Sequence, residues 1–78
     1  MKYIIVTNRA GIESACLFSE TLQHADMAGT QKVLSAGFCS IENGVIKVWG
    51  ESDSLKIKSK ESDAVDIKLA ISFSMFKH

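Results

Sequence analysis

The Asn43-Gly44 pair constrains the fold of this chain more than any other feature of its sequence. Asparagine followed by glycine accepts the positive φ angles of a two-residue type I′ turn, the turn that most often joins two strands of a β-hairpin. The pair lies between two runs rich in β-branched and aromatic residues, at positions 33–41 and 45–49. The sequence therefore predicts an antiparallel hairpin near the middle of the chain.

A two-residue loop also fixes which residues of the hairpin lie opposite each other. The expected pairs are Glu42 with Val45, Ile41 with Ile46, Ser40 with Lys47, Cys39 with Val48 and Phe38 with Trp49. Side chains alternate between the two faces of a strand, so each face can be assigned. The face predicted to join the core carries Cys39, Ile41, Ile46 and Val48. The other face is polar near the turn, with Ser40 and Lys47, and aromatic farther from it.

Three further segments have strand character. Residues 2–7 are rich in β-branched side chains and predict a first strand. A turn cluster at 8–11 follows, and residues 14–18 predict a second strand that folds back on the first. In residues 54–59, Leu55 and Ile57 alternate with lysines, which predicts a half-exposed strand at a sheet edge.

Two segments are candidate helices. Ser19 is a plausible N-cap and Gly29 a plausible stop for a short helix over residues 20–28. Over residues 61–71, Glu61, Asp63 and Asp66 complement the N-terminal dipole of a helix, and the sheet needs a covering layer. Apolar residues at every second position from 65 to 75 are instead typical of a strand. We expect a C-terminal helix, with a C-terminal strand as the alternative.

Together these elements predict a small α+β domain that spans residues 1–78. Its antiparallel sheet would have about four to five strands, with one short helix after the second strand. A chain of 78 residues is too short for more than one domain. Its 46% apolar content excludes a disordered tail, and equal numbers of basic and acidic residues exclude nucleic-acid binding through bulk charge.

The sequence also indicates the cellular compartment of the protein. The apolar stretch in residues 1–7 is too short for a secretory signal, and no run approaches the roughly 20 apolar residues of a membrane helix. Cys16 and Cys39 both lie in apolar runs and are expected to be buried free thiols. We therefore expect a soluble, cytoplasmic protein in a reducing compartment, with no membrane partner.

Four stretches of the chain, residues 24–28, 33–38, 50–56 and 63–64, carry a resemblance. The chain resembles small uncharacterised proteins encoded by bacteriophages and prophages. The resemblance implies a phage or prophage origin and a location in the cytoplasm of the bacterial host. It also implies that the segment beginning near Asp63 is helical, and it brings no catalytic residues.

No constellation of catalytic or ligating side chains emerges from the sequence. The soft metal ligands Cys16, His24, Cys39 and His78 have long, irregular spacings that fit no metal site. His24 and Asp26 could serve a Cys16 or Ser14 nucleophile, but positions two apart on a helix do not face each other. His24 is therefore expected to be a helix-cap or surface residue. No enzyme activity, metal or cofactor is predicted.

Three functions remain open. The first is a non-enzymatic interaction protein that binds and modulates a bacterial or phage protein through Phe38, Trp49 and Lys47. This requires the aromatic pair to be exposed, whereas the alternative is that the C-terminal segment covers it. The second is a nucleic-acid-binding module, in which Lys56, Lys58 and Lys60 join the two aromatics. The third is a self-associating structural protein, with a C-terminal strand that pairs in a homodimer.

Overall fold

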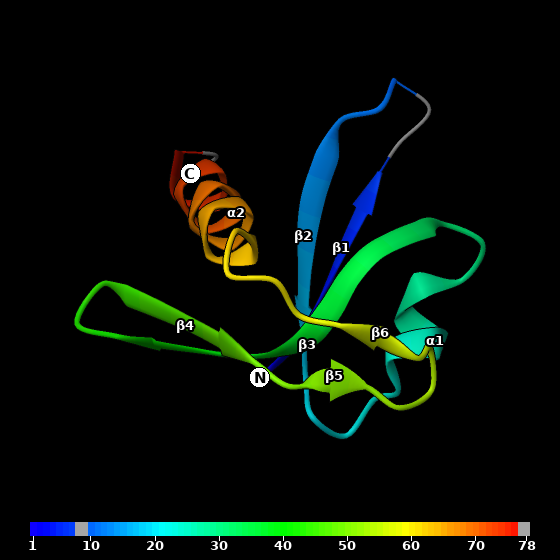
Figure 1. Ribbon diagram of the computed structural model, residues 1–78. Coiled ribbons are helices and arrows are strands. Elements are labelled where there is room, and N and C mark those ends of the chain that lie inside the picture. The colour runs from blue at the N-terminus through cyan, green and yellow to red at the C-terminus, as the bar shows by residue number, and fades with distance from the viewer. Residues whose placement is uncertain (8–9, 77–78) are drawn as a thin grey trace.

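The computed structural model of the protein describes the backbone of residues 1–7 and 10–76, and the side chains of 1–7 and 10–72. Figure 1 shows the order of the elements. They are β1 (Lys2–Thr7), β2 (Glu13–Phe18), α1 (His24–Ala28), β3 (Lys32–Glu42), β4 (Val45–Trp49), β5 (Glu51–Ser52), β6 (Ile57–Lys58) and α2 (Asp63–Phe76). A four-stranded antiparallel sheet has the order β2-β1-β3-β4, and β5 and β6 form a second, two-stranded sheet. The α+β prediction is confirmed.

The central hairpin has the predicted register at every position. Glu42 lies opposite Val45, Phe38 lies opposite Trp49, and the three pairs between them are also as expected. Asn43 and Gly44 have φ angles of 52° and 79°, the positive values that the turn requires. The local chemistry of the turn is therefore sufficient to set the pairing of β3 with β4.

Strand β1 lies in the middle of the sheet, between β2 and β3. Its residues Tyr3, Ile4, Ile5 and Val6 are all buried, because layers of the protein cover both faces of this strand. The predicted strands at 2–7 and 14–18 are confirmed, and β2 begins one residue earlier, at Glu13. Residues 8 and 9 of the predicted turn lie outside the described residues.

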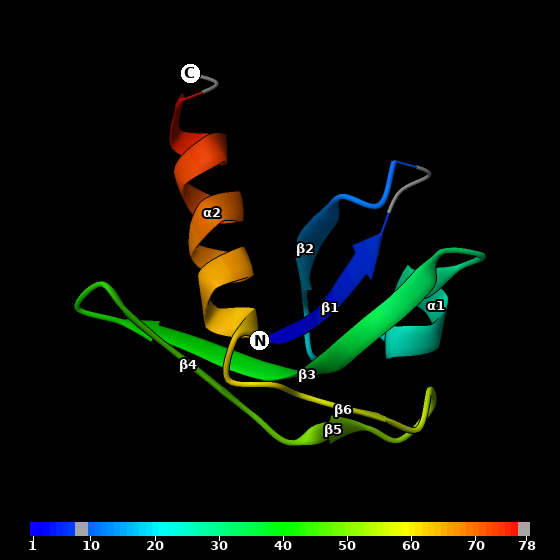
Figure 2. The same ribbon diagram turned by 45° about the horizontal axis from the view of Figure 1, so that its top comes forward.

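The sheet has an apolar core on each face. On one face, Ile4, Val6, Phe18 and Ala36 pack with Ala28 of α1 and with Leu55 and Ile57. On the other face, Tyr3, Ile5 and Cys39 pack with Ile67 and Ile71 of α2. Figure 2 shows α2 standing on one side of the sheet, away from β5 and β6. Helix α2 therefore covers only one of the two faces.

The C-terminal segment is a helix, and the alternative of a C-terminal strand is wrong. Helix α2 begins at Asp63, two residues later than predicted, and continues past position 71. Ile67 and Ile71 are four residues apart and face the sheet together, which is the spacing that one side of a helix allows. The alternating pattern leaves Val65 and Leu69 on the outside, with 62% and 63% of their surfaces exposed.

The first helix is shorter than predicted and begins at His24 instead of residue 20. The Ser19 hydroxyl accepts a hydrogen bond from the backbone N–H of Thr21, and the N–H of Leu22 bonds to the Ser19 carbonyl. These bonds make a turn at 19–22, so Ser19 does not cap the helix. The predicted stop at Gly29 is confirmed, with a φ angle of 56°.

The predicted strand at 54–59 shrinks to the two residues of β6. The Ser52 hydroxyl accepts a hydrogen bond from the N–H of Leu55, and the Ser52 carbonyl accepts one from Lys56. Lys56 takes a positive φ of 59° in this turn, which is incompatible with a strand. Leu55 and Ile57 nevertheless both pack against the core.

Ile41 does not join the core as predicted, because it lies near the end of the projecting hairpin and is 41% exposed. Cys39, farther from the turn, is buried as expected. Cys16 is only half-buried, and both cysteines are free thiols. Burial raises the pKa of the Cys39 thiol.

Within the described part of the chain, no helix is long and apolar enough to cross a membrane.

A buried carboxylate fixes the position of α2 on the sheet. Asp63, 2% exposed, accepts hydrogen bonds from the Tyr3 hydroxyl at 2.5 Å and from the Ser35 hydroxyl at 2.6 Å. It also accepts one from the backbone N–H of Lys60 at 2.9 Å, which caps the start of the helix. The side chain therefore joins β1, β3 and the first turn of α2.

Replacing this carboxylate should be among the most destabilising changes in the chain. Asp63→Ala leaves two buried hydroxyls without their acceptor, and each such group costs about 1–3 kcal/mol. We expect urea denaturation to show a free energy of unfolding lower by about 3 kcal/mol or more. The control Asp53→Ala removes an exposed carboxylate and should change stability by less than about 0.5 kcal/mol. Equal effects of the two substitutions would contradict this role for Asp63.

The same contact predicts how stability depends on alkaline pH. Burial, and after it the hydrogen bond to Asp63, raises the pKa of Tyr3 above its ordinary value of about 10. A raised folded-state pKa gives stability that is fully present below about pH 10 and is lost as the pH rises further. Above that pH, unfolding should become easier by up to about 1.4 kcal/mol per pH unit.

Tyr3 is the only tyrosine of the chain, so its ionisation can be followed directly by tyrosinate absorbance. Tyr3→Phe should be less stable at neutral pH, because the hydrogen bond is gone, but should lack this part of the alkaline dependence. The stability curves of the two proteins should therefore converge above about pH 10. Parallel curves would show that Tyr3 does not titrate in this way.

Candidate interaction surface

The Phe38–Trp49 pair lies on the face of the sheet that α2 does not cover. The two rings are stacked, with centroids 6.4 Å apart and planes inclined by 21°. Phe38 is half-buried, whereas 49% of the Trp49 surface is exposed. The alternative that the C-terminal segment covers this pair is wrong, because Ile67 and Ile71 pack against the opposite face.

A second aromatic contact supports Phe38 from the interior. The ring of His24 meets Phe38 edge-on at 5.9 Å and meets Phe18 edge-on at 5.4 Å. The His24 Nε2 atom donates a hydrogen bond to the carbonyl oxygen of Gly37 at 3.0 Å, since a carbonyl can only accept. Four rings thus run from the core to the surface, in the order Phe18, His24, Phe38 and Trp49.

His24 is 3% exposed, so the expectation of a cap or surface residue is wrong. Its ring is drawn inward because α1 packs across β1 and β3, where two aromatic side chains and a backbone carbonyl surround it. A hydrogen bond between positions 24 and 37 is a tertiary contact that no local pattern indicates. Among the described residues, the His24 ring contacts the Gly37 carbonyl, Phe18 and Phe38, and no hydrogen bond joins it to Cys16 or Ser14 as a catalytic pair would require.

Two glycines allow the backbone to approach the aromatic pair closely. A Cβ atom at Gly50, where φ is 75°, would come within 2.9 Å of the Phe38 ring. A Cβ at Gly37 would come within 2.6 Å of the Trp49 carbonyl oxygen. Both distances are too short for carbon, so glycine is required at each position. These residues were not singled out in the sequence, although a glycine inside a β-rich run is a signal of close backbone approach.

Lys47 lies on the same face as Trp49, two residues away along β4 and opposite Ser40. Val45, two residues farther toward the turn, is also on this face and is 57% exposed. We refer to the exposed side chains Val45, Lys47 and Trp49, together with the supporting ring of Phe38, as the Trp49 surface. All of them belong to the central hairpin, so its confirmed register brings together the predicted partner-binding residues.

The structure does not align Lys56, Lys58 and Lys60 along one strand. All three are exposed, but Lys56 lies in the turn before β6 and Lys60 lies in the segment that leads into α2. Only Lys58 belongs to a strand, where it is opposite the acidic Glu51. The basic face expected of a nucleic-acid platform therefore lacks the common strand on which it was predicted.

The described residues contain no group of three or more histidine, cysteine or acidic side chains that could hold a metal ion. His78, one of the four soft ligands considered from the sequence, lies outside them.

Comparison of the chain with protein-family models, with curated proteins and with solved structures found no match. The resemblance to phage and prophage proteins accordingly stays a prediction.

The two rings of the pair should differ in what they contribute to stability. Trp49→Ala removes a half-exposed ring and should lower the free energy of unfolding by about 1 kcal/mol or less. Phe38→Ala removes a ring held between His24 and Trp49 and should cost about 2–3 kcal/mol. Urea denaturation of both variants checks this order. A larger loss for Trp49→Ala would mean that its ring belongs to the core.

Proposed function

We propose that the protein is a small, non-enzymatic binding module that recognises another protein through the Trp49 surface. One observation carries this proposal: Trp49 is half exposed, yet it stacks on the half-buried ring of Phe38, which in turn contacts the buried ring of His24. Tryptophan is among the residues most often found at the energetic centre of protein interfaces. An anchor that is already ordered loses little conformational entropy when it binds.

The neighbouring side chains fit the same proposal. Val45 adds exposed apolar area, and Lys47 places a positive charge between Val45 and Trp49. In an interface, a charge next to an apolar anchor favours a partner with a complementary acidic group and raises the rate of association. We infer that the partner has an apolar pocket bordered by at least one carboxylate.

The resemblance stated from the sequence suggests the setting. If the chain is of phage or prophage origin, the partner is a bacterial or phage protein in the host cytoplasm, and binding would modulate that protein. Only the resemblance supports this origin, whereas the Trp49 surface supports binding independently of it.

The test uses Trp49 as both the altered residue and the reporter. The chain has a single tryptophan, so burial of its ring by a partner should shift the fluorescence emission to shorter wavelength. A partner captured from a bacterial lysate, then purified, should bind the wild-type chain and lose at least about tenfold in affinity for Trp49→Ala.

Val65→Ala is the matched control, since Val65 is an apolar residue on α2 that is 62% exposed, against 49% for Trp49, and α2 lies across the sheet from Trp49. Its affinity for the partner should equal that of the wild type. Lys47→Gln should weaken binding by a few-fold and make it less sensitive to salt. A partner that binds Trp49→Ala as tightly as the wild type, with no change in tryptophan emission on wild-type binding, would rule out the Trp49 surface.

A further inference from the structure

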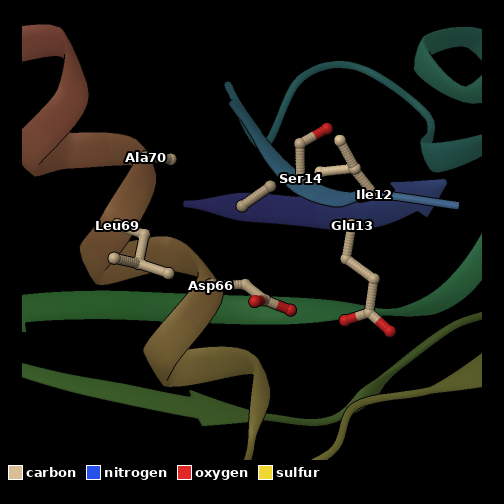
Figure 3. A pocket seen from close by; sticks show the side chains of 7 residues that line it. Ile12, Glu13, Ser14, Asp66, Leu69 and Ala70 are labelled. Carbon is tan, nitrogen blue, oxygen red and sulfur yellow. The ribbon is translucent and has the colours of Figure 1, made fainter. Parts of the chain in front are cut away.

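A groove runs between β2 and α2, on the face of the sheet opposite the Trp49 surface. It has a volume of about 570 Å³ and is lined by Ile12, Glu13, Ser14, Ala15, Asp66, Leu69 and Ala70. Figure 3 shows these side chains on the two facing elements. We refer to this set as the β2–α2 groove.

One wall of the groove is an edge of the sheet. Strand β2 pairs with β1 on one side and with no strand of the described chain on the other. An edge strand presents backbone N–H and C=O groups at alternate residues, and these groups can pair with an added strand. The groove therefore offers backbone hydrogen bonding as well as apolar contact.

Exposed apolar side chains line the groove from both sides. Leu69 of α2 is 63% exposed, and Ile12, directly before β2, is 62% exposed. The small side chains of Ala15 and Ala70 also line the groove. Helix α2 thus has more apolar surface on this side than the four strands of its own sheet cover.

The groove is also acidic. Glu13 and Asp66 contribute carboxylates from opposite walls, and in Figure 3 both are directed to the same side of the groove. Neither carboxylate forms an ion pair or hydrogen bond with any residue that the structure describes, and no lining residue is basic. A positive charge in the groove would therefore be attracted by both.

We propose that the β2–α2 groove binds an extended segment of another protein that carries a lysine or arginine. The segment would add to the sheet as a fifth strand beside β2, in the way that strand addition occurs at other exposed sheet edges. Its apolar side chains would contact Leu69 and Ile12, and its basic side chain would reach Glu13 and Asp66.

The charges favour this occupant over others. A second copy that paired through its own β2 would bring another Glu13 and no basic residue, since β2 contains none. A nucleic acid or an anionic membrane would be repelled by the two carboxylates. An extended segment with a basic side chain can pair with the β2 edge, contact Leu69 and Ile12, and form an ion pair with Glu13 or Asp66.

This inference does not depend on the proposed function, since Trp49 lies on β4, at the other edge of the sheet. The two sites can therefore fail separately. The probes are two blocked synthetic peptides in which threonine alternates with valine and lysine, or with valine and glutamate. Each is titrated into the isotopically labelled wild-type chain, and the backbone amide signals are followed by NMR.

The lysine peptide should shift the amide signals of residues 13–18 and 66–70 and leave those of the Trp49 surface unchanged. The glutamate peptide should bind at least about tenfold more weakly. Absence of shifts at millimolar lysine peptide, equal binding of both peptides, or shifts confined to residues outside β2 and α2 would each overturn the proposal.

Single substitutions distinguish the effect of the two groove carboxylates on peptide binding from the effect of the net charge of the protein. Glu13→Gln and Asp66→Asn should each weaken binding of the lysine peptide by about two- to fivefold, the range expected of a partly exposed charge pair. Glu42→Gln, an exposed carboxylate at the end of the hairpin, is the matched control and should leave the affinity unchanged. Equal losses in all three variants would show that the peptide responds to overall charge and not to the groove.

Discussion

The carboxylate of Asp63 decides how the halves of this chain fit together. It bonds to Tyr3, 60 residues away in the sequence, and to Ser35, while it also caps the first turn of α2. Because these groups are buried, a shift of α2 along the sheet or to its other face would leave polar atoms unsatisfied. Apolar packing alone lacks such directionality, so this one side chain selects the face that α2 covers.

The choice of face creates both proposed binding surfaces. Helix α2 lies on the side of Tyr3 and Cys39. Of the elements that the structure describes, α1 and the small β5–β6 sheet lie over the opposite face. There the His24 ring contacts Phe38, and Trp49 stays half exposed. On its own side, α2 leaves Leu69 exposed beside the edge strand β2. The Trp49 surface and the β2–α2 groove, at opposite edges of the sheet, thus both follow from the face on which α2 packs.

The parts of the fold that were predictable from the sequence are those that local chemistry determines. The turn at Asn43-Gly44 fixed the whole hairpin register, and the acidic residues at the start of α2 correctly favoured a helix over a strand. The predictions that failed are those where a turn or a distant contact outweighed the residue pattern. The bond of the Leu55 N–H to Ser52, three residues earlier, makes a turn that replaces most of the predicted strand. His24 lies in the core because of a tertiary contact with Gly37, 13 residues away.

The two candidate sites differ in the same way, so the sequence indicates one of them and not the other. The members of the Trp49 surface all lie on a single hairpin, so its register was enough to bring them together, although their exposure depended on where α2 packs. The β2–α2 groove joins residues 13 and 66, whose proximity exists only after the helix has docked. If Asp63 directs that docking, then a loss of Asp63 should disrupt the groove more than the hairpin, because the turn that organises the hairpin is local.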